Sequence, residues 1–379
     1  MKAVVGGAEF ADAVAAAARV VPKRPYTPVL GGLLVEVADD SMTVSATDFD
    51  TSLAASMPAS VGKDGRALLA GPMLAAIAAQ AKSADTVHVG LDDGIVTVGA
   101  GRARWQVSCI DDTDWPGMPG MPESIGTVSA AEWSESIAQT APFCMALKDG
   151  ETPNGKHGVQ VVAGPDGARL LSSDGIRLSE RDLTTWEASG TGDYDLLLPP
   201  SALGGARLSG PSVTLHADEM GNVFGLSDDR RRVILRPLAT RSRVPAGTLE
   251  FERPHVLRID RDDLLAAVKD VAIAADQVRS GLGTAIHVKV SGGELGMQVV
   301  GDGAASTAAC SVDYDGPDLA WLLGPHLLLD VLVHFGSEVY LHSPGLRSSE
   351  LTVTRALLLT GKPLDGSPNF RHLVMPRKR

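Results

Sequence analysis

The chain has 379 residues, of which 44% are hydrophobic and 21% charged, and its formal net charge at pH 7 is −12. These values are typical of a soluble protein with two or three ordinary domains. Aromatic residues are scarce, at 7 Phe, 5 Trp and 4 Tyr, which argues against stacking platforms for single-stranded nucleic acid. The acidic total also argues against the broad basic surface of most nucleic-acid-binding proteins.

The N-terminal stretch is apolar, but Glu9 and Asp12 interrupt it and Arg19 closes it, which argues against a signal peptide. No apolar run approaches the roughly 20 residues that span a bilayer. Three scattered cysteines form neither a disulfide framework nor a zinc motif, and they fit a reducing compartment: Cys109, Cys144 and Cys310. We therefore expect a cytoplasmic protein without a metal or other cofactor.

One helical spacing, i, i+4, i+7, i+11, occurs three times along the chain, which predicts one helix face in each of three repeats. The three sets are Phe10, Val14, Ala17 and Val21; Trp133, Ile137, Thr140 and Cys144; and Leu264, Val268, Val271 and Ala275. Each predicted helix follows a short apolar strand. Candidate caps precede the helices, and Ser129 with Glu132 has the pattern of a capping box: Gly6, Ser129 and Asp260.

A second helix is predicted in each repeat behind a proline that suits the first helical turn. These prolines are Pro72, Pro200 and Pro325, and alternating strands surround each predicted helix. Pro/Gly-rich connections separate the repeats, so we expect an α+β fold of three domains with antiparallel sheets, at residues 1–122, 123–252 and 253–379. Equivalent domains this large favour an arc or a closed ring over a solenoid.

Catalytic motifs are missing from the sequence. The nine histidines show no H-E-x-x-H spacing, and neither a dinucleotide fingerprint nor a Walker loop is present. No catalytic residue is predicted, and a non-enzymatic role is favoured. The alternative from another class is an α+β enzyme with a site in an interdomain cleft near His157 or His326.

Cations follow the predicted helices at similar places in the repeats, although no third of the chain is basic. They include Arg19, Lys23, Arg24, Lys82, Lys148 and Arg207. Such sparse cations fit weak, salt-sensitive binding of DNA without sequence preference. On spacing alone, the favoured interpretation is that these charges merely interact with helix C-termini. The run at residues 230–232 follows two aspartates and is predicted to form a solvated hairpin turn.

Short motifs in a fixed order resemble one known family over essentially the whole chain. They are RVVPKRP (residues 19–25), PVLGG (28–32), GRARW (101–105), SDGIRL (173–178), LDVL (329–332) and LVMP (373–376). The family is the bacterial sliding clamp, the beta subunit of DNA polymerase III. The resemblance implies a head-to-tail homodimer in which six domains form a closed ring around double-stranded DNA, without sequence preference. Helices would line the hole, and the ring would give the polymerase processivity.

The resemblance also implies roles for particular residues. The DNA-facing cations would be Lys23, Arg24, Lys82, Lys148 and Arg207. The dimer interface would join the first domain to the third of the partner subunit, through Trp105, Val107, Ile273 and Ala274. Ala274 stands where a larger apolar residue is usual, and Trp105 is predicted to fill the space.

Partners such as the DNA polymerase III alpha subunit, the clamp loader and repair proteins would dock through short apolar peptides. Their pocket would be formed by Lys156, Ser173, Gly175, Ile176, Arg177, Leu178, Pro245, Leu327, Leu373, Met375, Pro376 and Arg377. The chain departs from the usual pattern at Lys156, Ile176 and Leu327 and in its cationic end, residues 377–379. A divergent second clamp with altered peptide preference, or with tolerance of a pocket-binding antibiotic, is the alternative within the same fold.

Overall fold

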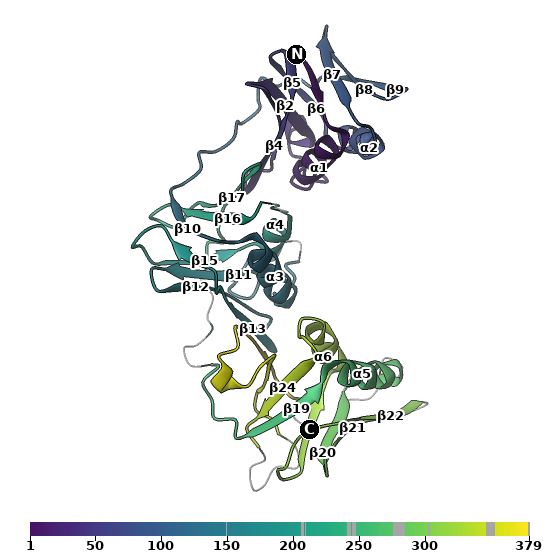
Figure 1. Cartoon of the computed structure of the whole chain (residues 1–379), viewed down its shortest axis with the longest axis vertical. Helices are drawn as coiled ribbons and strands as arrows, with labels where there is room; N and C mark the ends of the chain where they lie inside the picture. Colours follow the sequence, from purple (N-terminus) through teal and green to yellow (C-terminus); the bar gives the residue numbers. More distant parts are fainter. Residues whose placement is uncertain are drawn as a thin grey trace. The chain divides into compact units, whose positions relative to one another are not determined.

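The computed structural model describes residues 1–148, 150–205, 208, 210–240, 244, 248–275, 285–301, 304–345 and 353–377 (Figure 1). The chain forms two compact units. Unit 1 comprises residues 1–137, 161–168 and 185–239, and unit 2 comprises residues 138–160, 169–184 and 240–379. Within the described residues, no helix is long and apolar enough to cross a membrane.

The helices are α1 (Gly7–Ala18), α2 (Gly71–Ala81), α3 (Ala130–Thr140), α4 (Pro200–Gly205), α5 (Arg261–Ala275) and α6 (Pro325–Leu332). Short 3-10 helices lie at Pro28–Gly31, Ala141–Phe143 and Leu364–Gly366. The strands up to the middle of the chain are β1 (Lys2–Val5), β2 (Gly32–Ala38), β3 (Ser41–Thr47), β4 (Thr51–Pro58), β5 (Ser60–Lys63), β6 (Gly65–Ala70), β7 (Val87–Asp92), β8 (Ile95–Ala100), β9 (Ala103–Ser108), β10 (Ser124–Ser129), β11 (Val159–Gly164), β12 (Gly167–Ser173) and β13 (Arg177–Asp182). The remaining strands are β14 (Glu187–Ala188), β15 (Tyr194–Leu198), β16 (Ser212–Ala217), β17 (Phe224–Ser227), β18 (Arg231–Leu235), β19 (His255–Asp260), β20 (Ile286–Ser291), β21 (Glu294–Gly301), β22 (Ala304–Ser311), β23 (Leu319–Leu323), β24 (Glu338–Ser343), β25 (Leu357–Thr360) and β26 (Phe370–Val374).

Unit 1 contains two antiparallel sheets. One has the order β5-β1-β7-β8-β9, and the other has the order β14-β10-β16-β17-β18-β4-β3-β2-β6. Helix α1 packs on β3 and β4 with Phe10, Val14 and Ala17 fully buried, as the helical spacing predicts. Its start lies against the end of α2, since a Cβ on Gly7 would be 2.2 Å from the Ala84 carbonyl oxygen. The two helices are therefore antiparallel neighbours.

The long sheet of unit 1 joins the first and second repeats through the pairing of β18 with β4. Arg231 lies at the start of β18, is only 4% exposed and forms an ion pair with Asp12 of α1. The hairpin predicted at residues 230–232 is therefore present, but the prediction of a solvated turn is wrong for Arg231. Local charge gave no sign of this burial, because β4 and α1 cover the arginine from another repeat.

Unit 2 contains the strand order β12-β13-β26-β25-β24-β19 and a separate antiparallel sheet of order β22-β21-β20-β23. Helices α5 and α6 pack together, and α5 also contacts β21 and β22 (Figure 1). Leu264, Val268 and Val271 of α5 are buried in the main core of this unit. Phe143, which follows α3 in the chain, is buried in the same core.

The helix caps agree only in part with the sequence predictions. The Asp260 carboxylate accepts hydrogen bonds from the amides of Asp262 and Asp263, which is the predicted N-cap of α5. The capping box at α3 is not reciprocal, because the Glu132 carboxylate accepts from the amide and hydroxyl of Thr185 instead of from Ser129. The predicted α+β class with antiparallel sheets is confirmed.

Candidate functional site

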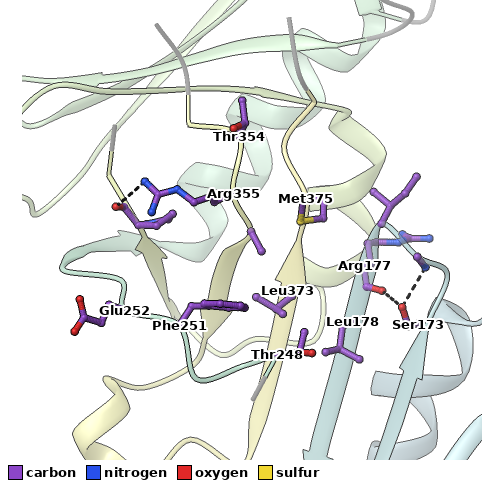
Figure 2. Close-up of a pocket in the computed structure, with 14 residues that line it drawn as sticks. Ser173, Arg177, Leu178, Thr248, Phe251, Glu252, Thr354, Arg355, Leu373 and Met375 are labelled. Atoms are coloured by element: carbon purple, nitrogen blue, oxygen red, sulfur yellow. Dashed lines mark hydrogen bonds between the residues drawn. The ribbon is translucent and has the colours of Figure 1, made fainter. Parts of the chain in front are cut away.

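A cavity of about 780 Å³ opens on the surface of unit 2 (Figure 2). One side is formed by the turn before β13, by β13 and by the end of β26. The other side is formed by the segments before β19 and before β25. The lining residues are Ser173, Gly175, Ile176, Arg177, Leu178, Thr248, Phe251, Glu252, Pro344, Thr354, Arg355, Ala356, Leu373 and Met375.

Strand pairing places the apolar floor of this cavity. Leu178 of β13 lies directly opposite Leu373 of β26, and Leu373 lies opposite Leu358 of β25. Side chains directly opposite on antiparallel strands share one face of the sheet. The three leucines are at most 5% exposed and form a small cluster of their own. Residues far apart in the sequence thus build one apolar surface.

The turn between β12 and β13 is held by its own polar side chains. The Ser173 hydroxyl donates to the Arg177 carbonyl at 2.7 Å and accepts from the Gly175 amide at 3.1 Å (Figure 2). The Asp174 carboxylate accepts from the amides of Ile176 and Arg177 at 2.9 and 2.7 Å. Gly175 has a φ of 91°, which favours glycine. The turn leaves the Ile176 side chain 53% exposed at the cavity.

The Arg177 guanidinium is fixed by three neighbours. Its Nε donates to Asp174 at 2.9 Å, its Nη1 donates to Asp330 of α6 at 2.6 Å, and it lies 5.1 Å from the centre of the Phe143 ring. Burial of Asp174 would raise its pKa, but the amides of Arg177 and Ile176 and the Arg177 guanidinium together hold that pKa below its usual range.

Lys156 borders a neighbouring cavity of about 630 Å³ that shares Ser173, Gly175, Leu178 and Thr248 with the first. Its ammonium group lies over Gly175, where a Cβ would be 2.5 Å from Nζ. No hydrogen bond or ion pair of this ammonium occurs among the described residues. A cation therefore stands at the junction of two largely apolar hollows.

Some of the predicted pocket residues line the cavity and others do not. The cavity lining includes seven of them: Ser173, Gly175, Ile176, Arg177, Leu178, Leu373 and Met375. Leu327 is 3% exposed and belongs to the core of unit 2, and Pro376 is also buried. The Arg377 amide donates to the Leu322 carbonyl at 2.8 Å. Pro245 lies outside the described residues.

Half of the residues that line the cavity were not predicted from the sequence. Thr248, Phe251 and Glu252 come from the connection before β19, and Pro344, Thr354, Arg355 and Ala356 come from the connection before β25. No motif marks either connection, and no local pattern indicates that they meet at Leu373. The one available signal was a phenylalanine in the polar connection before a predicted strand.

The predicted DNA-facing cations are exposed where the structure describes them. Lys23 and Arg24 follow α1, and Lys82 caps the C-terminus of α2. Because α1 and α2 are antiparallel, these cations follow opposite ends of the helix pair. Lys148 of unit 2 is exposed, and Arg207 lies outside the described residues.

The strands that end the sheets of the described part of the chain include β9 in unit 1 and β22 in unit 2. Trp105 and Val107 belong to β9, where Trp105 is partly exposed and Val107 is buried. Ile273, near the end of α5, is 73% exposed. Ala274 is only 9% exposed and packs in the core of unit 2, so it has little surface to offer a partner.

The histidines considered for an enzyme site lie in unremarkable surroundings. His157 is 3% exposed, and its Nδ1 accepts from the Asn154 amide. His326 lies on α6 and is exposed in part, and the partial desolvation of its ring and the charge of the nearby Arg177 lower its pKa. Within the described part of the chain, no three His, Cys, Asp or Glu side chains lie close enough to hold a metal ion.

A family model and a search of known proteins both point to one family. Residues 1–119 match the model of the N-terminal domain of the DNA polymerase III beta subunit. The beta sliding clamp of Streptomyces coelicolor is 27% identical over 97% of this chain and 96% of its own length. The chain is therefore similar to the beta sliding clamps over nearly its whole length. The resemblance stated from the sequence motifs is therefore confirmed.

Other members of the family extend this finding. The beta sliding clamp homolog GriR of Streptomyces muensis is 24% identical over 97% of this chain and 96% of its own length. Among solved structures, the Pseudomonas aeruginosa clamp bound to griselimycin matches with a TM-score of 0.85 at 18% identity, and each chain is covered completely. The Thermotoga maritima beta subunit matches with a TM-score of 0.83 at 19% identity, covering 100% of this chain and 99% of that one. At these identities the structures establish the clamp fold.

Proposed function

We propose that this chain is a DNA sliding clamp of the cytoplasm, a homodimeric ring that encircles duplex DNA and confers processivity on the replicative polymerase without catalysis of its own. The observation that carries the proposal is the cavity of unit 2. It gathers the exposed Ile176 and Met375 and the buried leucines 178 and 373 around one hollow. An apolar hollow rimmed by a few fixed hydrogen-bonding groups suits an extended peptide with apolar anchors.

The ring would consist of three domains per subunit, at residues 1–122, 123–252 and 253–379, closed head to tail. The open edges of β9 and β22 support this arrangement, since strand edges readily pair with another chain. Their surroundings are complementary in charge. Arg102 and Arg104 are exposed at β9, whereas Asp263, Asp270 and Glu294 surround a hollow beside β22.

The closed ring, rather than tight contacts with phosphates, would keep the protein on DNA. Lys23, Arg24, Lys82 and Lys148 are exposed and have no ion pair among the described residues, so they are free to meet phosphates. Few phosphate contacts give weak, salt-sensitive affinity. Weak contact suits a ring that must slide, and the enclosed DNA keeps a tethered polymerase at high effective concentration. The alpha subunit, the clamp loader and repair proteins would use the same peptide pocket in turn.

Retention on DNA of two topologies tests the proposal. After loading, the protein should remain on a nicked circle in 0.5 M salt and should slide off when the circle is linearised. Native mass spectrometry should give a dimer. Equal retention on circular and linear DNA, or a monomer at micromolar concentration, would exclude a ring.

Lys156 favours a second candidate, a clamp whose pocket has diverged in ligand preference. Its ammonium group stands over Gly175 at the junction of the two hollows, where the family usually places an apolar side chain. A cation there disfavours apolar ligands by the cost of its desolvation. Griselimycin and an apolar peptide should therefore bind more weakly than they bind to the Streptomyces coelicolor clamp, and Lys156→Leu should reduce the difference. Equal affinities for the two clamps would eliminate this candidate.

A further inference from the structure

The cavity of unit 2 has a wall that no sequence motif marks, formed by residues 248–252. Phe251 in this wall is 67% exposed. The other phenylalanines of the chain, apart from Phe49, are at most 7% exposed: Phe10, Phe143, Phe224, Phe335 and Phe370. Figure 2 shows the Phe251 ring directed toward Leu373 across the cavity. A ligand that covers an exposed aromatic ring beside an apolar hollow buries apolar surface, which lowers the free energy of the complex.

Arg253 holds the backbone of this wall. Its Nη1 donates to the carbonyls of Leu249 and Phe251 at 3.0 and 2.9 Å, and its Nε donates to the Ala356 carbonyl at 3.4 Å. Leu249 and Ala356 pack in turn on the small cluster of Leu178, Leu358 and Leu373. The backbone on both sides of Phe251 is thus tied to the floor of the cavity.

The burial of the Arg253 guanidinium has a cost in folding free energy. Arg253 is only 7% exposed, and its guanidinium has no carboxylate partner among the described residues. Burial lowers its pKa. Burying an arginine without a counter-charge destabilises the fold. These hydrogen bonds fix the backbone at Phe251, from which the ring projects at the cavity.

We infer that Phe251 is a specificity-determining residue of the pocket that packs against an aromatic or leucine side chain of the bound peptide, and that Arg253 is the residue that positions it. This inference rests on the proposed function. The chemistry of the ligand follows from the other groups in the lining. Arg177 already binds two carboxylates, and the Arg355 guanidinium already donates to the carbonyls of Pro344 and Gly345. The lining then offers a ligand the apolar side chains of Ile176, Leu373 and Met375, together with the exposed carboxylate of Glu252.

The test measures binding of two labelled synthetic nonapeptides by fluorescence anisotropy. One carries leucine and phenylalanine two residues apart, and the other carries leucine and alanine at the same positions. Phe251→Ala should weaken binding of the phenylalanine peptide about tenfold and of the alanine peptide less than twofold. Phe49→Ala is the matched control, because Phe49 is 59% exposed on a loop of unit 1 that does not line the cavity.

The outcomes separate the inference from the proposed function. Unchanged affinity of Phe251→Ala for the phenylalanine peptide would overturn the inference and leave the pocket intact. If the unaltered protein binds neither peptide, the peptide-docking function itself falls, and the inference falls with it. Because Phe251 is largely exposed, Phe251→Ala should keep the thermal unfolding midpoint and report on binding alone.

Arg253 is tested by additivity and rescue. Arg253→Met should weaken binding of the phenylalanine peptide about as much as Phe251→Ala, because the ring is no longer held. The double variant should bind no more weakly than either single variant. Arg253→Lys retains donors for the two carbonyls and should recover part of the affinity. Additive losses without rescue would show that Arg253 only stabilises the fold.

Discussion

Arg177 and Asp330 lie 153 residues apart in the chain and are joined by a hydrogen bond of 2.6 Å between Nη1 and Oδ2. The same guanidinium binds Asp174 and lies over Phe143, so one side chain ties the turn before β13 to α6 and to the core of unit 2. The side chain is 12% exposed. The position of a cavity-lining residue is therefore set by contacts that reach across the whole unit.

Arg177→Met should lower the free energy of unfolding by about 1–3 kcal/mol, because it leaves the half-buried Asp174 without its cation. Asp330→Asn should cost under about 1 kcal/mol, since the Asp330 side chain is 50% exposed and water screens its pair. Urea unfolding of the two variants beside the unaltered protein measures both changes. Equal losses would mean that Asp330, rather than Asp174, is the main partner.

Two buried histidines should make the protein sensitive to mild acid. Burial, helped by the charge of Arg177, lowers the pKa of His372 to about 3, and burial with the charge of Arg253 lowers the pKa of His342 to about 4. In the unfolded chain both titrate near 6.5. The folded protein thus binds fewer protons, and its stability is complete above pH 7 and falls as the pH drops below about 6.5.

From pH 7 to pH 5 each of these histidines should remove about 2 kcal/mol from the free energy of unfolding. His372→Gln, which can still hydrogen-bond Ser179, should remove roughly half of this pH dependence. His88→Gln at an exposed position is the control. Urea unfolding at several pH values measures the slope, and an unchanged slope in His372→Gln would contradict the assignment.

The head-to-tail dimer should depend on Ile273. Ile273→Asp places a charge on a side chain that is 73% exposed, so the subunit should fold normally and dissociate to monomers. Trp105→Ala should weaken the dimer from the β9 side. Met220→Asp changes an 81% exposed apolar side chain on a turn of unit 1 and should leave the dimer intact. Sedimentation velocity at low concentration distinguishes these results. A dimeric Ile273→Asp protein would place the interface elsewhere.

The cations after α1 should act through phosphate contacts. Lys23→Gln combined with Arg24→Gln should weaken DNA binding for all sequences and reduce the dependence of log affinity on log salt by about 1 per lost contact. Lys63→Gln on strand β5 removes an exposed cation outside the helices and serves as the control. Anisotropy titrations over a range of salt concentrations give the slopes. The same slope in all three proteins would show that residues 23 and 24 do not meet DNA.

The helices and the strands beside them were predictable because their signals are local. The helical spacing located α1, α3 and α5, and prolines at or next to the first helical residue located α2, α4 and α6. The cavity was predictable only in part. The motifs at residues 173–178 and 373–376 indicated its β13–β26 side through a family resemblance, whereas Phe251 and Arg355 carried no motif.

The sequence by itself determined the positions of the helices, the α+β class, the resemblance to the sliding clamps and one side of the cavity, because periodicity and short motifs are properties of neighbouring residues. The tertiary structure alone decided which side chains are buried and what they meet. Arg231 is buried because β4 and α1 cover it, and Ala274 and Leu327 face the core of unit 2. Leu178 lies opposite Leu373 because β13 pairs with β26, and Phe251 lines the same cavity from the connection before β19. Whether a side chain is buried, and which residues it then contacts, depends on segments far away in the chain, so local sequence patterns do not predict it.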